Sequence, residues 1–377
     1  MGTITIGDSC EVLNGYAFKS EKYTSSGIRI IRIANVQKGY IEDDSPVFYQ
    51  TADVDLNKYM LRENDLLVSL TGNVGRTALL TKDMLPAALN QRVACLRLKT
   101  NKITRGFLFH LLNSDYFESK CIQSSQGVAQ KNLSTEWLKS YDLPLYSLSK
   151  QNEITKILDN VRNTIVLKKQ EIQKYDELIK ARFIEMFGDP LLNPNGHLKE
   201  KIEKHINLLS GYPFKSEQYV EKGINICGGL IIMPQKIKWD ECVHWSSVEG
   251  FEDYLLNEND IVMALDRPWI SGGFKIAKVD AEHLPALLIQ RTARIRSIDI
   301  NQDYLYYCFI TGGFDKHSNV TGSLVPHISA KDIRSFEIMI PPVELQNQFA
   351  DFIQQVDKSR FDIKKSITEL EREVVYD

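Results

Sequence analysis

The stretch Gly-Tyr-Ala-Phe-Lys-Ser-Glu-Lys-Tyr at residues 15–23 returns as Gly-Tyr-Pro-Phe-Lys-Ser-Glu-Gln-Tyr at residues 211–219. Seven of these nine positions match at a shift of 196 residues. Further along, residues 59–65 match residues 254–260 at a shift of 195. The same order is kept by Gln91-Arg92 and Gln290-Arg291, Gly127 and Gly322, Ser134 and Ser329, Leu143-Pro144 and Ile340-Pro341, and Gln151-Asn152 and Gln346-Asn347. Matches that keep their order across the whole chain indicate an internal duplication.

Each copy begins with short apolar runs, as at residues 28–33, 66–70 and 93–98, which Gly, Asn and Asp separate. This pattern is typical of β-strands joined by turns. Short helices are expected near residues 107–112 and 304–309. We therefore predict an α+β protein with two similar mixed α/β domains, at residues 1–146 and 191–342.

The second part of each copy carries the apolar pattern of a long helix. Alternate steps of four and three residues from Ile154 to Met186 meet eight apolar residues in ten, and the same steps from Phe349 meet seven in eight. This is an a/d coiled-coil seam, and Gly188 and Pro190 end the first helix. We predict long helices at residues 147–190 and 343–377 that pair antiparallel. The residues expected to pair them are Ile154, Leu158, Val161, Ile165, Ile172, Ile179, Phe349, Ile353, Val356, Ile363, Ile367 and Leu370.

The alternative is that each helix lies on its own domain as an ordinary amphipathic helix. If the helices pair, their length matters, because about 35 residues at ~1.5 Å each extend roughly 50 Å. A rod of that length would hold two domains further apart than the ~34 Å between successive major grooves on one face of DNA.

Composition excludes several classes of protein. The chain has 377 residues, 43% apolar and 25% charged, which is typical of a soluble protein of two domains. It has neither an apolar run of membrane-spanning length nor a secretory signal, so a cytoplasmic location is expected. Six cysteines without a CxxC pair favour reduced thiols. The net charge of −3 argues against nonspecific DNA coating but permits a local basic groove.

Catalytic motifs are missing from the sequence. It has no phosphate-binding loop, no Gly-x-Gly-x-x-Gly, no Asn-Pro-Pro-Tyr/Phe methyltransferase loop, no His-Glu-x-x-His and no Gly-x-Ser-x-Gly. The seven histidines show no ligand spacing, and the carboxylate pairs at 43–44 and 252–253 are typical of solvated turns. We therefore expect a noncatalytic chain with no metal site and no cofactor of its own.

Two related but divergent domains on a spacer suggest two similar tasks on two different targets, which for DNA means an asymmetric bipartite site. Residues 71–76, Thr-Gly-Asn-Val-Gly-Arg, combine glycines with side chains that can contact adenine, guanine or phosphate. The equivalent residues 266–273 carry different side chains. The residues expected to contact DNA are Lys19, Asn73, Arg76, Gln91, Arg92, Gln126 and Lys131 in the first domain, and Lys215, Arg267, Lys275, Gln290, Arg291 and Ser323 in the second.

The tandem plan resembles the specificity subunit of type I restriction–modification systems. The motifs that carry the resemblance are the domain starts at 14–20 and 210–216, the stretch 62–76, the domain ends at 143–154 and 340–349, and Phe-Ile-Glu-Met-Phe-Gly-Asp-Pro at 183–190. Each motif is loose, but their order, repeated twice, is specific and covers nearly the whole chain.

The resemblance implies a function. Each domain would be a target recognition domain that reads one half of a split double-stranded DNA site. The long helices would space the domains and dock two methyltransferase subunits, which bind S-adenosylmethionine, and ATP- and Mg-dependent restriction subunits would join them. Family members often continue further, so a shortened second helix is expected. The competing hypothesis is an adaptor with two protein-binding modules and a coiled coil for dimerisation.

Overall fold

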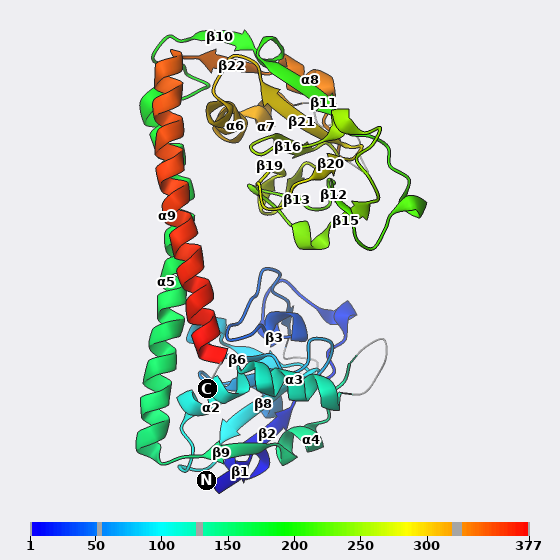
Figure 1. Ribbon diagram of the computed structural model, residues 1–377. Coiled ribbons are helices and arrows are strands. Elements are labelled where there is room, and N and C mark those ends of the chain that lie inside the picture. The colour runs from blue at the N-terminus through cyan, green and yellow to red at the C-terminus, as the bar shows by residue number, and fades with distance from the viewer. Residues whose placement is uncertain (1, 51–54, 126–130, 319–325, 376–377) are drawn as a thin grey trace. The chain divides into compact units, whose positions relative to one another are not determined.

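The structure, a computed structural model, describes residues 2–50, 55–125, 131–318 and 326–375, with side chains described up to Arg372. It divides into two compact units, which are described separately below (Figure 1). The first is Met1–Lys168 with Ser366–Asp377, and the second is Lys169–Lys365. Both borders therefore fall inside long helices, and the domain bounds expected from the sequence stay a prediction.

In its described residues, the first domain contains three antiparallel or mixed sheets and four short α-helices (Figure 1). A strand pair joins its ends, a four-stranded sheet has the order β2-β8-β5-β6, and a three-stranded sheet has the order β4-β3-β7. The strands are β1 (Gly2–Thr5), β2 (Cys10–Asn14), β3 (Ile28–Ile31), β4 (Phe48–Tyr49), β5 (Leu66–Ser69), β6 (Thr77–Leu79), β7 (Ala87–Leu89), β8 (Val93–Leu98) and β9 (Asp142–Leu145). The helices are α1 (Ile6–Ser9), α2 (Arg105–Leu112), α3 (Asp115–Ser124) and α4 (Thr135–Ser140).

The central strands of this domain are apolar on both faces because each face covers a different core. In β5, Leu66 and Val68 pack into the core under α2 and α3, whereas Leu67 packs into the core shared with β3 and β7. The helices begin where Thr104 and Ser114 accept hydrogen bonds from backbone N–H groups of the first turn. Alternation along the strands and capping residues thus account for this architecture.

The second domain repeats the same plan (Figure 1). Its strand pair is β10-β22, its four-stranded sheet is β11-β21-β16-β19, and its three-stranded sheet is β15-β12-β20. The strands are β10 (Leu198–Lys201), β11 (Ile206–Ser210), β12 (Ile224–Cys227), β15 (Val243–Trp245), β16 (Ile261–Ala264), β19 (Ile276–Lys278), β20 (Ala286–Leu288), β21 (Thr292–Ser297) and β22 (Glu337–Ile340). The helices are α6 (Gln302–Thr311), α7 (Phe314–His317) and α8 (Ala330–Ser335).

The second domain also carries two small hairpins that add to the shared plan. They are β13 (Ile232–Met233) with β14 (Lys236–Ile237), and β17 (Trp269–Ile270) with β18 (Gly273–Phe274). Because β17 and β18 lie between β16 and β19, they lengthen the connection that the first domain makes between β5 and β6. The predicted tandem repeat is confirmed, with a divergent loop region in the second copy.

The repeated sequence motifs have structural roles in both domains. A Cβ atom on Gly15 would lie 2.2 Å from the backbone carbon of Asn90, and one on Gly211 would lie 2.0 Å from the carbonyl oxygen of Ile289, so both positions require glycine. The Asp of each Glu-Asn-Asp motif forms a two-pronged ion pair, Asp65 with Arg97 and Asp260 with Arg296. The matching stretches therefore preserve the fold of the domains.

Helix α5 (Leu148–Phe187) leaves the first domain, and α9 (Val343–Val375) leaves the second. The two helices begin in the same way. The amide of buried Gln151 accepts a hydrogen bond from the backbone of Thr104, and that of buried Gln346 accepts one from Asn301, each at 2.8 Å. The amide nitrogens donate to backbone carbonyls, including that of Pro341 in the second copy. The repeated glutamine thus fixes the direction in which each helix starts.

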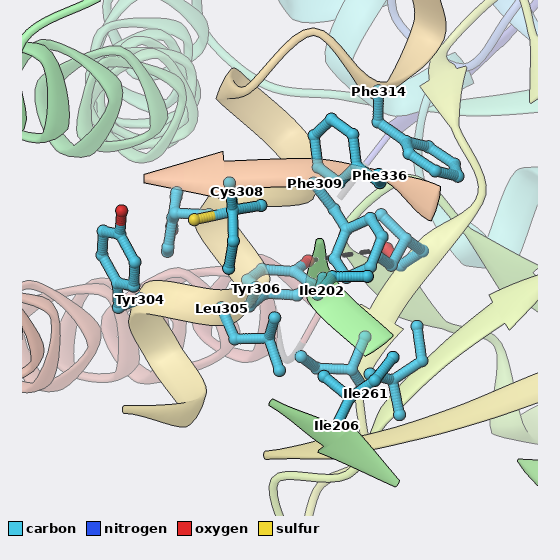
Figure 2. Close-up of a cluster of buried hydrophobic side chains, with 14 of the residues drawn as sticks. Ile202, Ile206, Ile261, Tyr304, Leu305, Tyr306, Cys308, Phe309, Phe314 and Phe336 are labelled. Carbon is cyan, nitrogen blue, oxygen red and sulfur yellow. Dashed lines mark hydrogen bonds between the residues drawn. The ribbon is translucent and has the colours of Figure 1, made fainter. Parts of the chain in front are cut away.

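In the second unit, the end of α5 packs antiparallel on the start of α9. The rings of Phe183 and Phe187 lie 5.5 and 5.4 Å from that of Phe349. About two turns earlier in α5, Asp176 forms an ion pair with Arg360, which lies further along α9. The partners of α5 thus have higher residue numbers in α9 as the residue number in α5 falls, which makes the packing antiparallel. The helices share the large core of the second domain, part of which Figure 2 shows around Tyr304 and Phe309.

The residues expected to pair the helices have different surroundings. Ile179, Phe349, Ile353 and Val356 belong to this shared core. Ile154 packs instead against the core of the first domain. Ile363 and Ile367 are buried, and the half-buried members are Leu158, Val161, Ile165, Ile172 and Leu370. Pairing through the middle of the helices stays a prediction.

Within the described ranges, no helix combines the length and the apolarity needed to cross a membrane. All six cysteines are free thiols. Burial raises the pKa of the Cys10 thiol to about 11, which keeps it protonated and unreactive near neutral pH.

Candidate nucleic-acid interface

Four segments of the first domain meet beside the end of β5 and the start of β8. The backbone N–H of Leu70 donates to the carbonyl of Arg92 at 2.9 Å, and that of Gly72 donates to Lys131 at 2.9 Å. The N–H of Gln91 donates to the carbonyl of Tyr16, also at 2.9 Å. These bonds join residues 15–19, 70–76, 90–92 and 131–133 into what we name the first loop cluster.

The same bonds recur in the second domain. The N–H of Leu265 donates to Arg291 at 2.9 Å, that of Arg267 to Pro326 at 2.7 Å, and that of Gln290 to Tyr212 at 2.8 Å. They join residues 211–215, 265–267, 290–291 and 326–328 into the second loop cluster. Segments far apart in sequence are thus brought together twice, by equivalent backbone bonds.

The first loop cluster contains most of the first-domain residues expected to contact DNA. Asn73, Gln91, Arg92 and Lys131 are exposed, as is Lys19 just after the Tyr16 segment. These side chains offer amide, ammonium and guanidinium donors on segments that backbone hydrogen bonds hold together, which suits contacts with bases and phosphates.

Arg76 differs from its neighbours because it is half-buried and already paired. Its Nη1 donates to the side-chain oxygen of Gln37. The hydrogen-bonding surroundings of Asn73 favour the amide orientation in which its oxygen faces Arg76. In that orientation the oxygen accepts a hydrogen bond from Nη1 of Arg76 at 3.2 Å. Gln37 was not predicted from the sequence, where nothing marks it as a partner of a residue 39 positions away.

In the second domain, Arg267, Gln290 and Arg291 are exposed in the loop cluster, and Lys215 is exposed three residues after Tyr212. Lys275 is buried, and its ammonium donates to the backbone carbonyl of Gly229. Burial lowers the pKa of Lys275, with the charge of Arg267 acting in the same direction. Lys275 therefore serves the interior of the domain in this structure, and its contact with DNA stays a prediction.

Two of the residues expected to contact DNA, Gln126 and Ser323, lie outside the described residues. The contacts expected of the remaining residues with DNA are likewise predictions.

The second loop cluster is built around a carboxylate that sequence reasoning missed. Asp266 accepts a hydrogen bond from Nη1 of Arg291 and another, at 2.7 Å, from Nδ1 of His327. Burial by itself would raise the pKa of Asp266, but these two partners outweigh it and lower the pKa, so the carboxyl is ionised. Only alignment of the two copies could have drawn attention to Asp266, which replaces Thr71 of the first domain.

The arrangement offers recognition chemistry. In the part of the chain that the structure describes, no group of three or more His, Cys, Asp or Glu side chains could hold a metal ion. The side chains gathered in the two clusters are hydrogen-bond donors and acceptors of the kind that read base edges and bind phosphates.

A family model described as the type I restriction modification DNA specificity domain matches residues 1–175 and 211–372. The specificity subunit of the type I restriction enzyme EcoAI of Escherichia coli is 30% identical over 216 residues, which are 53% of this chain but only 36% of that protein. The specificity subunit of the type I restriction enzyme MjaVIII of Methanocaldococcus jannaschii is 27% identical over 318 residues, 79% of this chain and 73% of that protein.

Two solved structures resemble the fold along almost its whole length. One is a chain from a study of complex assembly and conformational transition of the type I R-M system, with 17% identity, a TM-score of 0.58 and coverage of 99% of this chain and 95% of that one. The other is the type I S subunit from M. genitalium, with 14% identity, a TM-score of 0.51 and coverage of 99% and 93%. At these identities the likeness concerns the fold alone.

Proposed function

Because the chain belongs to the type I restriction–modification DNA specificity family, we propose that it is the noncatalytic subunit that selects the DNA sequence for a methyltransferase and restriction complex. Each domain reads one half of an asymmetric bipartite site in double-stranded DNA. The first loop cluster contacts one half-site and the second loop cluster contacts the other.

One observation carries this proposal: the same backbone network builds a loop cluster in each domain, with different side chains on it. The N–H donors of Gly72 and Arg267 occupy equivalent places in that network. Their side chains differ completely, as do those of Thr71 and Asp266 beside them. The same backbone network carrying different side chains supports the proposal that the two domains recognise two different DNA sequences.

The long helices support a role in assembly. Several apolar side chains of α5 point into solvent in the isolated chain, among them Ile157, Val166, Leu167 and Leu178. Phe361 does so on α9. Exposed apolar side chains that recur along one helix support a surface for another protein. We assign this surface to two methyltransferase subunits, which would bring S-adenosylmethionine, and restriction subunits would bring ATP and Mg²⁺.

Helix α5 also supports a role in spacing. It contains 40 residues in one uninterrupted helix, which corresponds to roughly 60 Å at ~1.5 Å per residue. We assign to α5, together with α9, the task of setting the number of base pairs between the two half-sites.

Methylation mapping tests this function. The genomes of a host with and without this gene are sequenced by a single-molecule method that detects N6-methyladenine. We expect one bipartite motif, with a fixed gap, to be methylated only in the host that has the gene. Identical methylation in both hosts, with the partner genes intact and expressed, would contradict the proposal.

A further inference from the structure

The second loop cluster contains a feature that the first lacks, a carboxylate placed between the side chains of an arginine and a histidine. Asp266 follows the end of β16 by two residues, and Arg291 lies just before β21. His327 reaches the same carboxylate from a third segment, whose backbone pairs with that of Asp266. We name these three residues the Asp266 cluster.

The first domain shows what the cluster replaces. Thr71 occupies the position of Asp266, and Arg92 that of Arg291. In the described part of the first domain, the guanidinium of Arg92 has no hydrogen-bond partner, whereas its backbone N–H donates to the Asn90 side chain at 3.1 Å. An unrestrained arginine can follow a phosphate, but a restrained one presents its donors in one direction.

The backbone of the second loop cluster indicates that its arginines serve a purpose beyond the fold. Arg267 and Arg291 have φ angles of 45° and 63°, in the left-handed region that residues with a Cβ rarely adopt. In the first domain the position of Arg267 is occupied by Gly72, with φ 70°, which adopts this conformation without strain. Two non-glycine residues in this region on one loop cluster are typical of functional positions.

The geometry leaves Arg291 ready to bind. Its side chain is 69% exposed, while that of Asp266 is only 21% exposed. A guanidinium carries five N–H donors, and in the described structure only Nη1 of Arg291 is engaged, by Asp266. The remaining donors face outward in an orientation that the carboxylate fixes.

Charge decides between the two targets that an arginine binds in DNA. A phosphate contact gains mainly from net positive charge, through release of counterions. The pair of Arg291 with an ionised Asp266 is neutral, so it offers direction rather than charge. Two donors in a fixed plane match the O6 and N7 acceptors of guanine in the major groove.

We propose that Asp266 is a positioning residue that presets Arg291 to read a guanine in the half-site of the second domain. The inference rests on the proposed function of this domain. Asp266 itself does not touch DNA, and His327 holds the carboxylate from its other side.

The test uses the full chain assembled with its methyltransferase subunits and a DNA duplex carrying the mapped site. Each guanine of the second half-site is replaced in turn by 7-deazaguanine, which lacks the N7 acceptor, and Kd is measured. We expect one such replacement to weaken binding by the wild-type complex roughly tenfold or more. R291A should bind the unmodified site about 10- to 100-fold more weakly and be insensitive to that same replacement.

Asp266 is tested by D266N, which keeps the shape of the side chain and removes its charge. Discrimination between guanine and adenine at the sensitive position should fall at least about fivefold, with the first half-site unaffected, and D266E should restore part of it. D280N is the matched control, because Asp280 also accepts a hydrogen bond from a histidine, His283, at 2.6 Å, in the same domain but outside the loop cluster. It should leave the discrimination unchanged.

Two results would overturn the inference. If R291A weakens binding equally on all sequences and lowers the salt dependence by about one phosphate contact, Arg291 binds the backbone. If D266N discriminates as the wild type does, the carboxylate does not position Arg291. Should D266N fail to assemble, R291K replaces it, since lysine keeps the charge without the planar fork and must lose the discrimination. A wild-type complex without any sequence preference would instead contradict the proposed function, and the inference with it.

Discussion

Replacement of Phe349 by alanine tests the packing of the two long helices in the second unit. Phe349 is fully buried near the start of α9, and its ring contacts those of Phe183, Phe187 and Tyr307 at 5.4–5.5 Å. Phenylalanine-to-alanine changes in a core destabilise by about 3–5 kcal/mol, from lost burial and the cavity left behind. We expect the upper part of that range, because three aromatic contacts are lost together.

The assay is unfolding in urea followed by tryptophan fluorescence. Trp239, Trp245 and Trp269 lie in the second unit and Trp137 in the first, so a W137F background makes the signal report on the second unit alone. F361A is the matched control, since Phe361 lies on the same helix but is 67% exposed, and it should change the free energy of unfolding by less than about 0.5 kcal/mol. A loss below about 1 kcal/mol for F349A would refute the described packing of α5 against α9.

Three further predictions concern the helix starts, the loops and the spacing. Q346A should destabilise the second unit by about 1–3 kcal/mol in the same assay, because buried Gln346 satisfies the backbone of Asn301 and Pro341; exposed Gln354 provides the control, and equal stability of Q346A and Q354A would contradict the anchoring role. R92A should weaken DNA binding by the assembled complex and reduce the slope of log K against log salt concentration by about 0.9, as for one lost phosphate contact, and an unchanged affinity and slope would remove Arg92 from the interface. Four residues inserted in α5 add about 6 Å and should widen the gap between half-sites by about two base pairs without changing either half-site, as methylation mapping would show; a constant gap would contradict the spacing role.

Much of the architecture could be predicted because the two copies keep the same residue wherever the fold accepts only that residue type. Gly15 and Gly211 match because no Cβ fits at either place. Asp65 and Asp260 match because each receives the same arginine ion pair. The repeated motifs thus report on the fold, and the divergent residues between them report on the site.

The end of the first helix was less predictable. Alternate steps of four and three residues from Ile179 predict Arg182 and Met186 in the seam, but Phe183 and Phe187 are the fully buried residues. The reason is tertiary: at this end α5 packs against both α9 and Tyr304 of the second domain, so its buried face is no longer that of a two-helix seam.

The loop clusters could be predicted only in part. The basic and amide side chains of residues 71–76 and 290–291 stand out in sequence, whereas the burial of Lys275 and the pairing of Arg291 with Asp266 depend on contacts between segments 25 or more residues apart. Pairings across such distances are set by the fold, and a single sequence does not reveal them.

The central claim is that each domain independently reads one half of a divided site. Its most direct test exchanges the first domain, residues 1–146, for that of a homologue and maps N6-methyladenine in the host genome. We predict a methylated motif in which one half is new while the other half and the gap are retained. A motif altered in both halves would contradict the claim.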